Sequence, residues 1–335
     1  MRLAGMVLAA GVGSRLAPFT DDIPKPLVPV LDRPLLGELL DQLAAAGAEE
    51  VFVNLHHQAD RVASYLSTRA CRVPVHHRVE PELTGPAGAL TLFADTLAAY
   101  DAVLVVSGDI VSDGGFEDLA AACAGGEADL VFGVTRSRGA RRFGVLELDG
   151  EGTVLSAVEK PDVPDEEEHW ISAGAYCLDT GLVGVTADLL AGGMPGVDYA
   201  RDLAPVLMAG GRRVSGHPLR GYWRDIGTPD SLLGANLDAV SGRIPRLLPE
   251  GSGAGGPGSG EPPVFVHPTA ELGEDVVFRG PVVIGAGTRV GSGAGLSHTV
   301  LLPGAVVPPG ALVHGGLIGA RDRRDAGPLP EAGAG

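Results

Sequence analysis

Lysine is almost absent from this sequence. Among 335 residues only Lys25 and Lys160 are lysines, and arginine supplies every other basic side chain. The formal net charge of −17 disfavours nucleic acid or an anionic membrane surface as a partner. A bias toward arginine, alanine and glycine is typical of a GC-rich genome, but that bias does not explain why lysine persists at these two positions.

Cysteine and long apolar runs are also scarce. Cys71, Cys123 and Cys177 have no metal-ligand spacing, and any disulfide pairing would leave one over, so reduced thiols are predicted. The longest apolar runs are broken by glycine and are too short to span a bilayer. The first residues do not have the pattern of a signal peptide. The sequence therefore predicts a cytoplasmic location and no membrane partner.

Short apolar strands alternate with amphipathic helices over residues 2–158. Strands are expected over 2–10, 49–55, 72–79 and 101–109, and helices over 34–47, 58–66 and 87–97. This alternation predicts an α/β fold with a Rossmann-like, doubly wound sheet and with ligands at the carboxyl ends of its strands. Closer strands over 130–135, 143–149, 153–159, 170–179 and 211–219 predict a mixed sheet that extends the first. A helix over 231–240 closes the first domain, residues 1–245.

The remaining residues change composition and then period. Residues 246–263 are rich in glycine, serine and proline and are predicted to be a flexible linker. From 264 to 320 apolar residues recur every six positions, at Val266, Leu272, Phe278, Ile284, Val290, Leu296 and Leu302. A second series, two positions ahead of the first, runs from Val264 to Val306. This period is typical of a parallel β-helix, here of roughly three coils. Residues 321–335 are predicted to be a flexible tail.

A glycine-rich turn directly follows the first predicted strand. Such a turn lets backbone N–H groups approach phosphate oxygens closely. The dinucleotide-binding fingerprint would need a further glycine where this chain has Leu16. A P-loop would need Gly-Lys-Ser/Thr, whereas Gly13 is followed by Ser14 and Arg15. The G-x-G pattern alone is also typical of an ordinary strand-to-helix turn.

The residues around this turn resemble a known signature. "GVGSRLAPFTDDIPKPLVPV" has the form G-x-G-(T/S)-R-L-x-P-x-T-…-P-K-P-L-x-P, and it is similar to the signature of nucleoside triphosphate sugar-1-phosphate nucleotidyltransferases. Further segments resemble motifs of that family in the same order: "VLVVSGD", "FGVLELD", "VEKP", "ISAGAYCLD" and "WRDIGTP". The resemblance covers residues 2–240. A short left-handed β-helix is appended to many such enzymes, and mannose-1-phosphate guanylyltransferase-like proteins are the most similar in layout.

The resemblance implies the site residues. It assigns catalysis to Arg15 and Lys25, the nucleotide to Leu8, Ala10, Gly11, Gly13, Ser14 and Gly88, the sugar phosphate to Gly144, Glu159, Lys160 and Gly174, and Mg²⁺ to Asp109 and Asp225. These residue types suit the chemistry. A sugar phosphate is already an anionic nucleophile, so catalysis needs positioning and charge neutralisation rather than an activated serine or cysteine.

The loop that contacts the base in this family departs from the usual pattern. It often reads L-G-T-A-G-A-L, whereas "ELTGPAGAL" places Thr84 and Pro86 where leucine and threonine are usual. Proline removes a backbone donor and stiffens the loop.

Mannose 1-phosphate with GTP is the favoured substrate pair. Glucose 1-phosphate with dTTP or UTP, and a modified sugar or cyclitol phosphate, stay open.

Two other classes of function remain as alternatives. One is a catalytically silent regulatory subunit, which predicts loss of the phosphate-handling residues. The other is an acyltransferase that would use His298 or His314 of the β-helix as a base. In the main interpretation the β-helix serves regulation or homo-oligomer assembly. The pairs His56-His57 and His76-His77 are interpreted as structural, because adjacent side chains on a strand point to opposite faces.

Overall fold

A computed structural model describes residues 1–126, 128–248, 261–320 and the backbone of 323–325. Most of the predicted linker and of the predicted tail lies outside the described residues. The chain forms two compact units. Unit 1 comprises Met1–Val12, Leu36–Ile110 and Gly114–Trp223, and unit 2 comprises Gly13–Leu35, Val111–Asp113 and Arg224–Gly335. In the part that the structure describes, no helix has both the length and the apolar character needed to cross a membrane.

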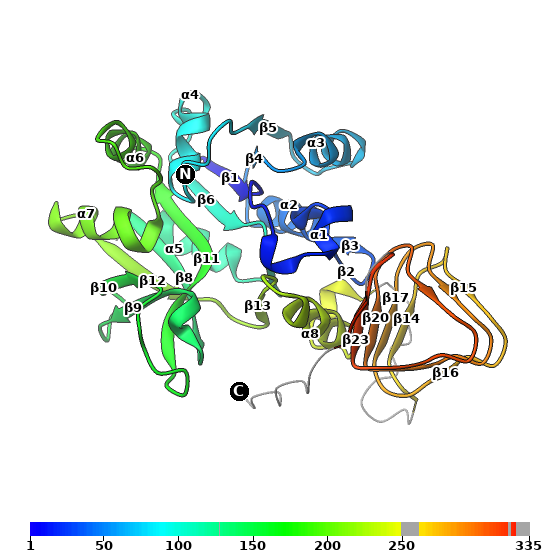
Figure 1. Ribbon diagram of the computed structural model, residues 1–335. Helices are drawn as coiled ribbons and strands as arrows, with labels where there is room; N and C mark the ends of the chain where they lie inside the picture. Colours follow the sequence, from blue (N-terminus) through cyan, green and yellow to red (C-terminus); the bar gives the residue numbers. More distant parts are fainter. Residues whose placement is uncertain (127, 249–260, 321–322, 326–335) are drawn as a thin grey trace. The chain divides into compact units, whose positions relative to one another are not determined.

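Unit 1 contains a mixed, nine-stranded sheet with the order β10-β9-β11-β6-β1-β4-β5 (Figure 1). Off this path, β8 pairs with β11, and β12 pairs with β8. Its parallel part consists of β1 (Leu3–Leu8), β4 (Glu50–Leu55), β5 (Val75–Val79) and β6 (Ala102–Ser107). The other strands are β8 (Leu130–Ser137), β9 (Gly144–Leu148), β10 (Val154–Glu159), β11 (His169–Asp179) and β12 (Val214–Pro218). The central strands β1 and β6 are buried, as parallel strands covered on both faces must be. The predicted fold class is confirmed.

The helices of unit 1 include the three predicted segments and several more. They are α2 (Leu35–Ala45), α3 (Ala59–Thr68), α4 (Ala94–Leu97), α5 (Phe116–Ala124), α6 (Leu182–Ala191) and α7 (Ala204–Ala209). The predicted helix 87–97 begins as a 3-10 helix, η3 (Gly88–Phe93), before it becomes α4. Just before α7 lies a π-helical segment, η5 (Tyr199–Leu203).

Unit 2 contains the predicted β-helix, in which three parallel sheets form the sides of a triangular coil (Figure 1). The sheets are β14 (Val264–Val266), β17 (Val282–Ile284), β20 (Thr299–Leu301) and β23 (Gly316–Ile318); β15 (Glu271–Leu272), β18 (Arg289–Val290) and β21 (Val306–Val307); and β16 (Val277–Phe278), β19 (Gly295–Ser297) and β22 (Leu312–His314). A last strand, β24 (Arg323–Asp325), pairs with β23 in the antiparallel sense. Helix α8 (Pro229–Val240) contacts β17, β20 and β23.

The predicted six-residue register is wrong beyond Leu296. Val282 pairs with Val264 in one coil and with Thr299 in the next, so the second coil is one residue shorter. Leu301, rather than Leu302, is consequently the partner of Ile284. Val306, which the second series aligns with Thr288, instead pairs with Arg289 and is 58% exposed. The physical reason is the corner before β20. His298 alone connects β19 to β20, with a left-handed φ of 49°. At the equivalent corner of the preceding coil, residues 279–281 connect β16 to β17.

Unit 2 also contains a short hairpin that follows the predicted lysine motif. Strands β2 (Pro29–Val30) and β3 (Arg33–Pro34) pair across a turn in which Leu31 has a φ of 58°. Asn236 of α8 is 1% exposed, and its Oδ1 accepts a hydrogen bond from Leu31 N at 2.8 Å. Its Nδ2 donates to Leu232 O at 3.0 Å and to Pro29 O at 3.3 Å. Asn236 thus holds the strained turn against α8.

We expect Asn236→Ala to lower the free energy of unfolding by about 1–3 kcal/mol, because it leaves the buried Leu31 amide without its acceptor. The urea midpoint followed by circular dichroism measures the loss. Asp230→Asn, at an exposed position of the same helix, is the control and should change stability by less than about 0.5 kcal/mol. An Asn236→Ala midpoint equal to that of the control would contradict the assignment.

Candidate active site

The glycine-rich turn and the lysine motif meet in unit 2. Gly13 has a φ of 72° and precedes a 3-10 helix, η1 (Ser14–Leu16), while Lys25 begins another, η2 (Lys25–Leu27). Thr20 Oγ1 donates to Gly13 O at 3.0 Å. A Cβ at Gly13 would lie 3.0 Å from Lys25 Cβ and 3.3 Å from Lys25 Cδ. The stem of Lys25 therefore lies against the backbone of the turn, which only a glycine allows.

Arg15 and Asp225 converge on a second glycine of the same unit. Asp225 ends the short strand β13 (Trp223–Asp225), and Gly227 follows two residues later. A Cβ at Gly227 would lie 2.5 Å from Asp225 Oδ1 and 3.1 Å from Arg15 Nη2. The segment is fixed on its other side by a capping box, in which Thr228 and Ser231 exchange hydrogen bonds at the start of α8. Unit 2 thus brings three of the predicted residues, Arg15, Lys25 and Asp225, to two neighbouring stretches of tightly packed backbone.

In unit 1, the ends of β1 and β6 approach closely. Gly108 N donates to Leu8 O at 2.9 Å, and a Cβ at Gly108 would lie 2.6 Å from that oxygen. Asp109 follows directly and is half-buried. Ala10 and Gly11 continue from β1, and within unit 1 no atom lies near the place of a Gly11 Cβ. Since the φ of Gly11 is not positive either, the local fold of unit 1 does not require glycine there.

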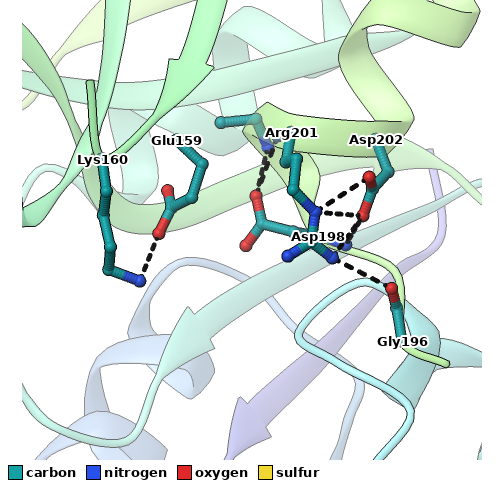
Figure 2. Close-up of polar contacts among 7 residues, drawn as sticks. Glu159, Lys160, Gly196, Asp198, Arg201 and Asp202 are labelled. Atoms are coloured by element: carbon teal, nitrogen blue, oxygen red, sulfur yellow. Dashed lines mark hydrogen bonds and ion pairs between the residues drawn. The ribbon is translucent and has the colours of Figure 1, made fainter. Parts of the chain in front are cut away.

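The predicted sugar-phosphate residues Gly144 and Glu159 pair across β9 and β10. A Cβ at Gly144 would lie 2.9 Å from Ala200 Cβ and 3.1 Å from Glu159 Oε2. Lys160 Nζ lies 2.6 Å from Glu159 Oε1, with the lysine side chain 65% exposed and the glutamate 19% exposed (Figure 2). The two side chains therefore form an ion pair whose ammonium end faces solvent.

Lys160 has an unusual backbone. Its φ is 49°, although lysine has a Cβ and Pro161 follows it. The Lys160 amide donates to Phe143 O at 2.9 Å. A left-handed conformation at a residue other than glycine costs roughly 1–2 kcal/mol, and such strain is concentrated at functional sites. The strain at Lys160 therefore supports a functional reason for keeping lysine there.

Gly174 lies in a bulge of β11, where the register with β8 shifts between Ser172 and Ala175. Its φ is 71°, and a Cβ would lie 3.0 Å from Ser107 Oγ at the end of β6. Trp223 Nε1 donates to Ala173 O at 2.8 Å and so fixes the bulge from outside the strand. The bulge re-aims the backbone of β11 toward the end of β6.

The segment that packs against Gly144 is itself firmly held. Asp198 accepts from the amides of Ala200 and Arg201 at 2.8 and 3.0 Å, and Arg201 pairs with Asp202 at 2.7 Å and donates to Gly196 O (Figure 2). Burial acts to raise the pKa of Asp202, but the hydrogen bonds from Arg201 and from the Asp198 amide outweigh burial and lower that pKa. This ionic cluster keeps Ala200 in place beside Gly144.

Two buried polar residues of unit 1 were not among the predicted site residues. Asn54 near the end of β4 and Glu80 just after β5 are each 3% exposed. Asn54 Oδ1 accepts from Ala9 N at 2.9 Å, and Asn54 Nδ2 donates to Glu80 Oε2 at 2.8 Å. The available signal was their position, because ligands bind at the carboxyl ends of neighbouring parallel strands in such sheets.

The predicted Mg²⁺ ligands fit the ion by their chemistry. Within the described ranges, no three His, Cys, Asp or Glu side chains form a ready-made metal cage. Mg²⁺ does not need one, since it is commonly held by one or two carboxylates together with substrate phosphates and water. Asp109 and Asp225 each offer a half-buried carboxylate of this kind.

Comparison with known proteins places the chain in a family. The family described as nucleotidyl transferase matches residues 4–242. Mannose-1-phosphate guanylyltransferase of Mycobacterium tuberculosis is 29% identical over 89% of this chain and 79% of its own length. Glucose-1-phosphate adenylyltransferase of Bacillus cytotoxicus is 25% identical over 94% of this chain and 90% of its own length.

A solved structure has the same fold. A candidate glucose-1-phosphate thymidylyltransferase from Bacillus anthracis aligns with a TM-score of 0.63 and 24% identity, over 76% of this chain and all of that one. At this identity the likeness speaks for the fold alone. The match over residues 4–242 confirms the predicted resemblance: the chain belongs to the nucleotidyl transferase family, among relatives that are sugar-1-phosphate nucleotidyltransferases.

Proposed function

We propose that this protein transfers a nucleotidyl group from a nucleoside triphosphate to a sugar 1-phosphate, in a Mg²⁺-dependent reaction that gives an NDP-sugar and pyrophosphate. The observation that carries the proposal is the grouping in unit 2. Lys25 packs on Gly13, and Arg15 meets Asp225 over Gly227. In a chain with a formal charge of −17, two cations gathered beside a glycine-rich turn support phosphate binding.

The proposed reaction forms one bond and breaks one. A phosphate oxygen of the sugar 1-phosphate attacks the α-phosphorus, and the bond from the α-phosphorus to the bridging oxygen of the β-phosphate breaks. The electron pair of the broken bond leaves with pyrophosphate. Because the attacking phosphate oxygen is already anionic, no proton has to be removed from the nucleophile. The difficulty is bringing two anions together, which positioned cations relieve.

Each predicted residue has a role in this scheme. Arg15 can bind triphosphate oxygens with its planar fork, and Lys25 can place a compact charge at the α-phosphate. Lys160 can bind the phosphate of the incoming sugar, with Glu159 accepting from a sugar hydroxyl. Asp109 and Asp225 would hold Mg²⁺, which when bound would neutralise phosphate charge.

The favoured substrates are mannose 1-phosphate and GTP, supported by the guanylyltransferase relative. Glucose 1-phosphate is the alternative sugar, in keeping with the adenylyltransferase relative. A pyrophosphate-release screen of the four ribonucleoside triphosphates and dTTP against a panel of sugar 1-phosphates, with Mg²⁺, tests both. Turnover with mannose 1-phosphate and GTP above every other pair is expected. Absence of turnover with all pairs would favour the silent regulatory subunit instead.

A substitution at Lys160 should separate backbone strain from function. We expect Lys160→Gly to relieve the left-handed strain and to raise the free energy of unfolding by up to about 1 kcal/mol. The same variant should raise KM for the sugar phosphate about tenfold or more, because the phosphate loses its ammonium partner. Urea unfolding and steady-state kinetics with each substrate varied in turn measure the two effects.

Lys160→Arg is the matched control for charge. It keeps a cation in the same strained conformation, so its stability should equal that of the unchanged protein and its KM should lie between the other two. An unchanged KM for the sugar phosphate in Lys160→Gly would remove Lys160 from substrate binding.

A further inference from the structure

A buried carboxylate organises the loop that carries Gly88. Glu80 is 3% exposed, and its two carboxylate oxygens accept three hydrogen bonds within unit 1. Oε1 accepts from Thr84 N at 2.7 Å and from Thr84 Oγ1 at 2.6 Å, and Oε2 accepts from Asn54 Nδ2 at 2.8 Å. The donors are the neutral groups of two residues, which makes the arrangement unusual because buried carboxylates are commonly paired with a cation.

The network has a fixed direction from donor to acceptor. Ala9 N donates to Asn54 Oδ1 at 2.9 Å, so the amide nitrogen of Asn54 must point to Glu80. All three groups that face the Glu80 carboxylate therefore donate hydrogen bonds to it, so this position needs a side chain whose polar atoms only accept. A carboxylate meets this need, whereas an amide of the same shape does not.

The network ends on the loop itself. A Cβ at Gly88 would lie 2.8 Å from Thr84 Cβ and 3.0 Å from Thr84 Oγ1, so Thr84 packs directly on Gly88. The other side of the loop is held by Val197, whose N donates to Thr84 O at 2.7 Å and whose O accepts from Ala87 N at 2.9 Å. Thr84 is thus held by hydrogen bonds to Glu80 on one side of the loop and to Val197 on the other.

We propose that Glu80 is a positioning residue for the nucleotide: as an acceptor-only centre it ties the loop Thr84–Gly88, through Asn54, to the end of β1. This inference rests on the proposed function, in which Gly88 and the residues after β1 contact the nucleoside triphosphate. Glu80 does not itself touch the nucleotide, because its oxygens are taken up by Asn54 and Thr84. It sets the distance between two nucleotide-contacting segments that are far apart in sequence.

The direction of the network provides a reciprocal test. Glu80→Gln places an amide NH₂ group, which can only donate, opposite neighbours that also donate. Asn54→Asp places the new carboxylate against the carboxylate of Glu80. Combining the two changes restores every hydrogen bond: the new carboxylate at position 54 accepts from Ala9 N and from the new amide, whose oxygen accepts from Thr84. The net charge of the double variant equals that of the original protein.

Calorimetric titration of the full chain with GTP, ATP, UTP, CTP and dTTP measures nucleotide affinity without requiring turnover. For the triphosphate that binds most tightly, we expect each single variant to weaken binding about tenfold to a hundredfold. The double variant should return to within about threefold of the original Kd. In steady-state assays the single variants should raise KM for the triphosphate and leave kcat within about threefold.

A milder pair keeps the test decisive if a single variant does not fold. Thr84→Val removes only the hydroxyl donor and should weaken binding several-fold, whereas Thr84→Ser keeps the donor and should bind as the original does. Circular dichroism confirms folding of each variant.

Several results would overturn the inference. They are unchanged Kd values in the single variants, a folded double variant that does not recover, a loss in kcat rather than in KM, or no binding of any triphosphate by the original protein. If the original binds a triphosphate but turns over no sugar phosphate, the proposed function fails while the Kd values still decide the role of Glu80.

Discussion

Lys25→Ala should lower kcat by about 10²- to 10³-fold, the loss typical of removing one preorganised charge partner from a transition state. The ammonium is expected to meet charge that develops on the α-phosphate and on the leaving pyrophosphate. Its stem is held against Gly13, with Cβ and Cδ 3.0 and 3.3 Å from the place of a Gly13 Cβ. Single-turnover measurement of pyrophosphate release with both substrates saturating reports this step.

Lys25→Arg is the matched variant that keeps the charge. Because the stem fits closely against the turn, a longer and planar guanidinium should not reach the same point, and we expect it to recover less than about a tenth of kcat. Unchanged circular dichroism would show that the fold survives in both variants. A Lys25→Ala enzyme with kcat within threefold of the original would exclude Lys25 from catalysis.

Asp225→Asn should be the second severe change. Asparagine keeps the shape that fits beside Gly227 but removes the charge, so we expect kcat to fall by about two orders of magnitude, as for a lost metal partner or charge. The Mg²⁺ concentration that gives half-maximal rate should rise at least tenfold. Kinetics across a Mg²⁺ titration measure both effects.

The control for this change is Asp230→Asn, which removes a carboxylate from an exposed position of α8 in the same unit. Its Mg²⁺ dependence should match that of the original protein. Gly227→Ala offers an independent approach, because its Cβ would contact both Asp225 and Arg15. If Asp225→Asn shows the original Mg²⁺ dependence, the metal assignment is wrong.

The sheet of unit 1 was predictable because its signals are local. Apolar runs of strand length alternate with helical periodicity, and each run indicates its own element without knowledge of its neighbours. The 3-10 start of the segment 87–97 was not predictable in the same way. Its backbone is set by Val197, which accepts from the amides of Ala87 and Gly88 from more than a hundred residues away.

The β-helix shows where a periodic signal becomes ambiguous. Val300, Leu301 and Leu302 are three apolar residues in a row, so the sequence pattern fits either register. The backbone decides between them, because the one-residue corner at His298 brings Thr299 opposite Val282. Hydrophobic period alone does not report the length of a corner.

The sequence by itself determined the family and the fold class, and it located the motifs predicted to bind phosphate. Each of these signals is local, whether a continuous motif such as "GVGSRLAPFTDDIPKPLVPV" or the alternation of strand and helix patterns along the chain. Only the tertiary structure decided which residues meet: Arg15 with Asp225 at Gly227, and Asn54 with Glu80 and Thr84. The physical reason is that a hydrogen bond or a steric contact joins atoms in space, and residues this far apart in the chain become neighbours only once the sheet and its loops have folded.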